Sequence, residues 1–217
     1  KRRLKIEYRP DNIVLSIAGD LDVVSPAVLA DAVMEMGGIP YPSLERPCLD
    51  VFHAAWSAVR IERKDIEQAH LCVGFAGRKA TASDVELGDA LENVLTAGMS
   101  SRLYMELRER NPLVYGVASY DVNHATTGVF ALTASCAPDK VRDVLRAFLK
   151  EIDAIANGGV ANAELARVLR LVETGMVKAR HTPRNACLYN GSMRRAIGIV
   201  KTDGEILDEA AAVTSND

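Results

Sequence analysis

The sequence predicts an α+β fold in which helices pack on one face of a largely antiparallel sheet. Three observations lead to this prediction. The expected elements run in the order strand, helix, linker, strand, helices, hairpin, helices. Two of the strands are close enough in sequence to form an antiparallel hairpin. The 217 residues, of which 48% are hydrophobic and 25% charged, suffice for a globular chain that buries about 70% of its surface on folding.

Residues 1–38 are expected to form one strand and one helix. The run Asn12–Ile17 is apolar and rich in β-branched residues, as strands are. Ser25-Pro26 supplies the residue types favoured at a helix N-cap and at the first helical position, and Gly37-Gly38 ends the helix. Residues 39–57 contain three prolines and show no sustained period, which is typical of a linker.

Residues 58–217 are expected to form a longer, second unit. A strand is predicted over Gln68–Gly77, because apolar residues alternate along it. A capping-box pattern at Ser83–Glu86 predicts a helix that runs to about residue 95. Ser100 or Ser101 caps the next helix, which ends at Asn111-Pro112 because a proline disfavours helical backbone in the residue before it.

The rest of this unit alternates between sheet and helix. The predicted hairpin pairs residues 113–121 with residues 127–136. A strongly periodic helix opens at Pro138-Asp139 and closes near Gly158. Two further helices are separated at Pro183, and a weak helical stretch follows Gly204.

Charge and cysteine content exclude several classes of protein. A net charge of −3 argues against a nucleic-acid partner, even though four arginines (Arg180, Arg184, Arg194, Arg195) lie in the last helices. No apolar run approaches the 18 residues of a transmembrane helix, so we expect no membrane partner. The four cysteines are scattered, and Cys72 and Cys136 lie in apolar strand-like runs. Buried free thiols are therefore expected rather than a disulfide framework.

No motif in the chain itself predicts a metal or a nucleophile. The four histidines occur without a H-x-x-E-H, H-E-x-x-H or C-x-x-C pattern (His53, His70, His124, His181). There is no G-x-S-x-G motif, and Gly98 is not followed by the G-K-[ST] of a phosphate loop. We therefore expect no cofactor in this chain.

One string carries a specific resemblance. It reads Gly-Met-Ser-Ser-Arg-Leu over residues 98–103, Leu-Arg-Glu-Arg over residues 107–110, and Leu-Val-Tyr over residues 113–115. It resembles the signature of the C-terminal domains of the pitrilysin, insulinase and mitochondrial-processing-peptidase family of zinc peptidases. Tyr8-Arg9-Pro10-Asp11-Asn12 and Gln68-Ala69-His70 agree with the family in order, so the likeness covers about residues 4–205.

The resemblance implies a half of a metallopeptidase, with a LuxS-like or processing-peptidase-like architecture. In this family two similar halves close over an extended peptide, and the zinc ion and its H-x-x-E-H motif belong to the other half. This half supplies an arginine and a tyrosine seven residues apart that hold the substrate. Arg108 and Tyr115 match that pair in spacing and context, whereas Arg102 is expected to pack structurally. Pro112 stands where the family usually has glycine, so the turn before Tyr115 is expected to differ.

The two residue types suit the role that the resemblance implies. An extended peptide offers backbone carbonyl oxygens, and charge develops on one of them during hydrolysis. A guanidinium is permanently charged and carries several N–H donors, and a tyrosine hydroxyl supplies one directed donor. An exposed strand edge adds sequence-tolerant affinity by pairing with the peptide backbone.

Two functions therefore follow as hypotheses. In the first, this chain is the non-catalytic, substrate-binding domain of a zinc metalloendopeptidase that cleaves peptides, and it has no activity alone. Its partners are then the peptide or unfolded-protein substrate and a complementary zinc-binding half or subunit. In the second, it is an inactive scaffold or protein-interaction module. The compartment stays open between the bacterial periplasm or cytoplasm and, in a eukaryote, the mitochondrion.

The likeness also predicts how the domains are bounded. Residues 1–38 resemble the closing strand and helix of the family's preceding half, and residues 58–217 a substrate-holding domain that ends before its last strand. The strand Asn12–Ile17 is then expected to fill the open edge of the sheet, either in cis or from a second copy. An exchange of that strand between two copies would produce a homodimer.

Overall fold

The computed structural model describes residues 13–22, 25–36, 58–80, 86–124 and 127–214. The chain divides into two compact units, Lys1–Asp50 with Met176–Val200 and Val51–Gly175 with Lys201–Asp217, and each is described by itself. The expected linker over residues 39–57 and the Ser83 of the expected capping box lie outside the described residues. Within the described ranges, no helix is long and apolar enough to cross a membrane.

The larger unit contains a three-stranded antiparallel sheet. Its strands are β1 (Ala69–Gly77), β2 (Val114–Asn123) and β3 (Gly128–Cys136), in the order β1-β3-β2. The predicted hairpin is confirmed as the pair of β2 and β3. The earlier strand β1 pairs with the other side of β3, so the last strand in sequence lies in the centre. The predicted α+β class is therefore confirmed.

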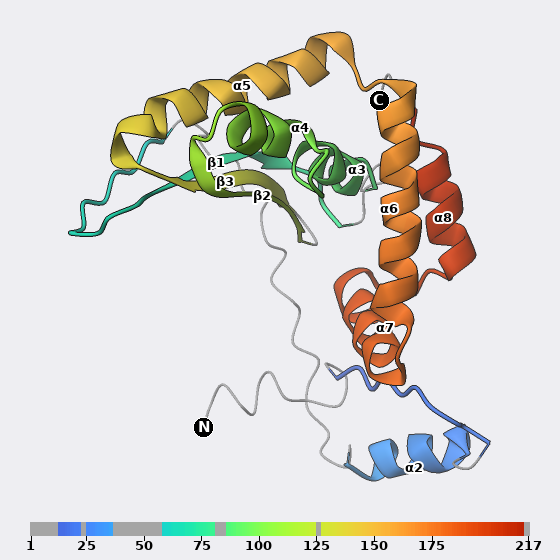
Figure 1. Ribbon diagram of the computed structural model, residues 1–217. Helices are drawn as coiled ribbons and strands as arrows, with labels where there is room; N and C mark the ends of the chain where they lie inside the picture. The colour runs from blue at the N-terminus through green and yellow to red at the C-terminus, as the bar shows by residue number, and fades with distance from the viewer. Residues whose placement is uncertain (1–12, 23–24, 37–57, 81–85, 125–126, 215–217) are drawn as a thin grey trace. The chain divides into compact units, whose positions relative to one another are not determined.

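The core lies between this sheet and the helices on one of its faces. In β3 every second residue is buried, and the buried apolar set includes Phe130 and Leu132. Helix α5 (Val141–Gly158) covers this face, and its Val144 and Phe148 are fully buried. Figure 1 shows α5, α3 and α4 on the same side of the strands. The strict two-residue period of β3 thus separates a helix-covered face from an open one.

The open face explains why one cysteine prediction is wrong. Cys72 is exposed, because it alternates with the inward residues of β1 and so lies on the uncovered side of the sheet. Cys136, at the end of β3, is buried as expected. Cys72, Cys136 and Cys187 are free thiols, and Cys48 lies outside the described residues.

Two short helical segments follow helix α3 (Glu86–Leu95) where the sequence predicted one regular helix. They are α4 (Arg102–Tyr104) and the π-helix η2 (Met105–Arg110). In η2 the backbone N–H of Asn111 donates to the carbonyl of Glu106, five residues earlier, at 3.1 Å. Such π turns are rare and occur often at functional sites. The spacing of apolar residues in the sequence did not distinguish this π-helix from a regular α-helix.

The segment is fixed to the core by two leucines, Leu103 and Leu107, which are both fully buried. Ser101 stands at the N-cap of α4 as one of the two predicted candidates, but its hydroxyl accepts no helix N–H. It donates instead to the carbonyl oxygen of Gly98 at 2.7 Å, within the turn that precedes the helix. That turn needs glycine at position 98, where φ is +80°.

Three more helices complete the chain, α6 (Asn162–Arg180), α7 (Pro183–Ile197) and α8 (Asp203–Ala211). The break at Pro183 is confirmed, with Thr182 as an N-cap whose hydroxyl accepts the N–H of Asn185 at 3.2 Å. Helix α8 begins with a capping box between Thr202 and Glu205, and it is a full helix where the sequence predicted only a weak one.

In the smaller unit, the prediction for the helix is confirmed and that for the strand is wrong. Helix α2 (Pro26–Met36) starts after Ser25, whose hydroxyl accepts the N–H of Ala27 at 3.3 Å. The described part of the expected strand, residues 13–17, forms no strand. A strand requires a partner for its backbone groups, and a hydrogen bond to this segment comes instead from a side chain of α7, the Cys187 thiol, which donates to the Ser16 carbonyl at 2.8 Å. The strand-exchanged homodimer stays a prediction.

Candidate functional site

Arg108 is presented on the outward side of the π-helix η2. The residue is exposed, while the preceding Leu107 is fully buried and fixes the inward side of the same turn. The guanidinium carbon of Arg108 lies 5.1 Å from the centroid of the Tyr104 ring, which is a cation–π distance. The aromatic face thus supports the cation, and the residue as a whole stays exposed.

The neighbouring arginines are engaged with carboxylates. Arg110 lies 3.5 Å from Glu106, which also has Lys150 at 3.8 Å, and Arg102 lies 2.8 Å from Glu164. Within the described part of the chain, Arg108 has no carboxylate partner. Of the three arginines between residues 102 and 110, it is therefore the one whose charge is available to a ligand.

Tyr115 lies at a β-bulge near the start of β2. The register of β2 against β3 shifts between Val114 and Gly116, so Tyr115 stands outside the regular pairing. It is 63% exposed, which places its ring and hydroxyl at the surface rather than in the core. Bulges frequently redirect a side chain beside an active site. The expectation that Pro112 makes the turn before Tyr115 differ from that of the family stays a prediction.

A backbone hydrogen bond connects the two elements that carry these residues. The N–H of Leu113 donates to the carbonyl oxygen of Leu107 at 2.9 Å, and only residues 111–113 separate η2 from β2. Arg108 follows one end of this bond, and Tyr115 lies two residues beyond the other. Both are exposed, and no hydrogen bond joins their side chains. The structure thus holds two exposed donors on two elements that this hydrogen bond joins.

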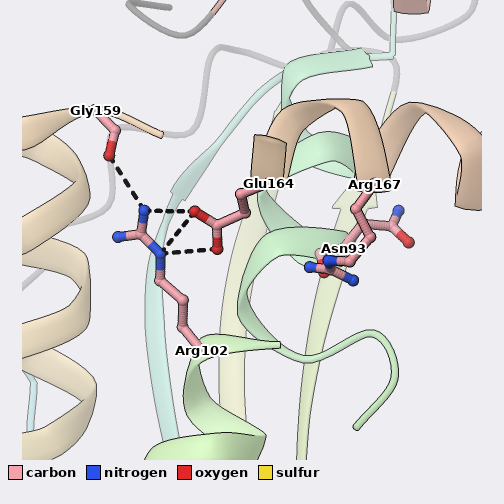
Figure 2. Close-up of polar contacts among 5 residues, drawn as sticks. All are labelled: Asn93, Arg102, Gly159, Glu164 and Arg167. Carbon is pink, nitrogen blue, oxygen red and sulfur yellow. Dashed lines mark hydrogen bonds and ion pairs between the residues drawn. The ribbon is translucent and has the colours of Figure 1, made fainter. Parts of the chain in front are cut away.

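Arg102 and Arg167 belong to a polar network that the sequence did not predict in full (Figure 2). Arg102 makes a bidentate contact with Glu164, at 3.0 Å from Nε and 2.8 Å from Nη2. Arg167, which sequence reasoning missed, donates to the carbonyl oxygens of Ala97 and Asn93 at 3.2 and 3.4 Å. The structural role expected for Arg102 is confirmed. An arginine in helix α6 offers no local signal for its partners, because they lie about 70 residues earlier in the chain.

Three carboxylates meet where α3 packs on β2. Glu92 accepts the backbone N–H of Asp121 at 3.0 Å, and Asn123 donates to the Asp121 carboxylate at 3.0 Å. Burial, and then the charges of Asp121 and Glu92, raise the pKa of Asp89 to about 6. Burial also raises the pKa of Glu92, against the lowering effect of its hydrogen bond from Asp121. Asp89 as a whole stays exposed, so water screens this carboxyl and the energetic effect is small.

The described residues do not form a zinc site. Among them, no group of three histidine, cysteine, aspartate or glutamate side chains is placed to hold a metal ion, and His53 lies outside the described ranges. The carboxylates near Asp89 are occupied by backbone and amide donors, and zinc prefers histidine and cysteine ligands.

Comparison with known sequences places this chain in a family. Residues 7–172 match the family described as the peptidase M16 inactive domain. A protein named an uncharacterized zinc protease in Streptomyces coelicolor is 31% identical over 201 residues, which cover 86% of this chain and 44% of that protein. A Bacillus subtilis protein of the same description is 26% identical over 210 residues, covering 95% of this chain and 49% of the relative. The chain thus spans about half the length of these relatives.

Solved structures show the same fold. A chain of the structure titled complex III2 from Candida albicans, with Inz-5 bound, has a TM-score of 0.76 at 19% identity and covers 89% of this chain and 48% of its own length. The peptidase M16 inactive domain from Pseudomonas fluorescens has a TM-score of 0.61 at 19% identity and covers 68% of this chain and 35% of its own. Together with the sequence match, this likeness shows that the chain belongs to the M16 peptidase family and is its inactive C-terminal domain.

Proposed function

We propose that this chain is the substrate-binding domain of a zinc-dependent metalloendopeptidase, and that the zinc site lies on another half or subunit. In this proposal Arg108 and Tyr115 bind the backbone of an extended peptide. The family match and the zinc-protease names of its relatives support the reaction class. The observation that carries the substrate-binding role is the state of Arg108, which is exposed, supported by Tyr104 and not neutralised by a carboxylate of the described residues.

The chemistry of an extended peptide fits these donors. Its carbonyl oxygens are evenly spaced and uncharged, so a guanidinium with several N–H groups can bind them without a matched side chain. The Tyr115 hydroxyl supplies a second donor on the same connection between η2 and β2. A hydrogen bond to a charged group contributes about 1.5–3 kcal/mol, and more where charge develops on the carbonyl oxygen. Arg108 is therefore expected to dominate the pair.

A scaffold without hydrolytic function is the second candidate. One structural neighbour is a chain in a structure titled complex III2, so this fold also occurs in a multisubunit assembly. A scaffold would need no exposed cation held on an aromatic ring, and it would tolerate its replacement. Arg108 therefore discriminates between the two candidates.

The test is a kinetic comparison in the full-length protein with its zinc-binding half or subunit, using a fluorogenic peptide. Arg108→Ala is expected to lower kcat/KM by about 10- to 100-fold, because a charged donor is lost. Tyr115→Phe is expected to lower it less, because a neutral hydroxyl is a weaker donor than a guanidinium.

The matched control is Arg110→Ala, which removes an arginine of the same π-helix that is paired with Glu106. It is expected to leave kcat/KM within about twofold of the parent value, as for other exposed ion pairs. The substrate-binding role is wrong if Arg108→Ala and Arg110→Ala have equal effects. An intact protein without peptidase activity on any unfolded substrate would favour the scaffold.

A further inference from the structure

The helical segment that carries Arg108 starts at a three-way contact made by Arg102. The guanidinium of Arg102 bonds both carboxylate oxygens of Glu164 at 2.8–3.2 Å, and its Nη2 also donates to the Gly159 carbonyl at 3.3 Å. Glu164 is in the first turn of α6, and Gly159 is the C-cap of α5. Figure 2 shows these groups converging on one guanidinium. One side chain thus connects the start of α4 with two other helices.

A second arginine fixes the turn on the other side. Arg167, one turn after Glu164 in α6, donates to the carbonyl oxygens of Asn93 and Ala97. These carbonyls belong to the last turn of α3 and to the turn after it, where the helix dipole favours a cation. Together, Arg102 and Arg167 hold the turn over residues 96–101 against α6 from both ends.

The hydrogen bonds of Arg102 and Arg167 depend on direction, whereas the apolar contacts of the same segment do not. Leu103 and Leu107 bury completely and hold the segment against the core, but hydrophobic contact does not define one rotation of a short helix. The Arg102–Glu164 pair is bidentate and planar, and it is shielded, since the two side chains are 20% and 19% exposed. It therefore defines the direction in which the segment leaves the turn.

We infer that Arg102 is a positioning residue for Arg108. By its contacts with Glu164 and Gly159, it sets the orientation of α4 and η2 and thereby the place of the Arg108 guanidinium at the surface. Arg102 touches no substrate and acts only through Arg108. The inference rests on the proposed function of Arg108 and adds a second, half-buried arginine to the residues on which peptide affinity depends.

The test uses Arg102→Lys in the full-length protein with its zinc-binding half or subunit. Lysine keeps the charge but has no planar fork, so it cannot reproduce the bidentate contact. We expect KM for the fluorogenic peptide to rise about 3- to 10-fold with little change in kcat. The control is Arg146→Lys, which alters an exposed ion pair with Asp143 on α5 and is expected to leave KM unchanged.

A double variant separates positioning from general stability. If Arg102 acts through Arg108, then Arg102→Lys raises KM in the parent protein but has no further effect when Arg108→Ala is already present. An equal rise of KM in both backgrounds, or no rise in the parent protein, would overturn the inference. If Arg108→Ala itself does not change kcat/KM, the proposed function fails, and this result is distinct from a failure of the Arg102 inference alone.

A second substitution keeps the test informative if Arg102→Lys does not fold. Glu164→Gln keeps both the size and one acceptor oxygen but removes the charge, so it weakens the same contact from the α6 side. The same rise of KM, again absent when Arg108→Ala is present, is expected. A Glu164→Gln protein that folds and binds peptide with parental KM would contradict the positioning role.

Discussion

Arg102 and Arg108 lie six residues apart in one helical segment, yet their surroundings are opposite. Arg102 is half-buried, bonded to Glu164 and to a backbone carbonyl. Arg108 is exposed, supported only by the face of the Tyr104 ring within the described part of the chain. The first environment engages Nε and Nη2 of the guanidinium with a carboxylate and a backbone carbonyl. The second keeps the charge and the donors accessible.

The contrast shows how one short segment can serve stability and binding with different residues. The inward side carries Leu103 and Leu107, which hold the helix on the core. The outward side carries Arg108, which is exposed and whose removal breaks no ion pair among the described residues. The predictions that follow test this separation, from the largest expected effect to the smallest.

Leu107→Ala should cause the largest loss of stability. The side chain is fully buried, and removing it leaves a cavity in the core, so we expect the free energy of unfolding to fall by about 2–5 kcal/mol. The neighbouring Arg108→Ala should change it by less than about 0.5 kcal/mol, as surface substitutions do. Urea unfolding of both variants measures the difference. Comparable losses for the two would show that the inward and outward sides are not separate.

Gly88→Ala should have an intermediate effect at the contact of α3 with β2. A Cβ at this position would lie 1.7 Å from an oxygen of the Asp121 carboxylate, so this carboxylate, which accepts from Asn123, or the helix must shift. We expect a loss of about 1–3 kcal/mol, as for other overpacked sites.

The matched control is Gly175→Ala, also within a helix, where a Cβ meets nothing within 4 Å. It should stabilise the protein by about 0.5–1 kcal/mol, because alanine favours helix over glycine. Thermal unfolding reports both values. A Gly88→Ala protein as stable as Gly175→Ala would mean that α3 does not pack on β2 as closely as described.

The smallest effect is expected from the pH dependence that Asp89 contributes. Its pKa is raised from 3.8 to about 6 in the folded protein, so the folded state binds this proton more tightly than the unfolded state does. The contribution of Asp89 therefore makes stability fall as pH rises from about 4 to about 6. Asp89 is exposed, so we expect less than about 1 kcal/mol, comparable to other exposed charge interactions.

The change that tests this effect is Asp89→Asn, which should raise stability above pH 6 and leave it unchanged near pH 4. Glu205 titrates in the opposite direction, because its hydrogen bonds with Thr202 lower its pKa. Glu205→Gln should therefore cost stability at neutral pH and not near pH 3. Urea unfolding at several pH values, with equal ionic strength, measures both. A difference between Asp89→Asn and the parent protein that does not vary with pH would contradict the assignment.

The regular elements could be predicted because their signals are local. Alternation in β1 and the helical period in α5 each arise from residues that share one face of one element. The π-helix could not be predicted, because the apolar spacing of residues 103 and 107 fits a regular α-helix equally well, whereas the bond from Asn111 to Glu106 appears only in the structure. The strand expected over residues 12–17 failed for a similar reason. Its apolar pattern is strand-like, but no described strand pairs with residues 13–17.

In the candidate site, too, some features could be predicted from the sequence and others could not. Arg108 and Tyr115 could be found from the motif that contains them, but their exposure could not. Tyr115 is exposed at a bulge, and Arg108 has no carboxylate partner among the described residues, whereas the nearby Glu106 contacts Arg110 and Lys150. Arg167 was missed because its partners lie about 70 residues earlier in the chain.

The central claim is that a peptide substrate contacts the surface formed by Arg108 and Tyr115. Photo-crosslinking tests it most directly, with an extended peptide that carries one photoreactive residue and the full-length protein with its zinc-binding half. After digestion, mass spectrometry identifies the labelled residues. We predict labelling within residues 104–115, reduced by excess unlabelled peptide and by Arg108→Ala but not by Arg110→Ala. Labelling confined to other parts of the protein, with none in residues 104–115, would contradict the claim.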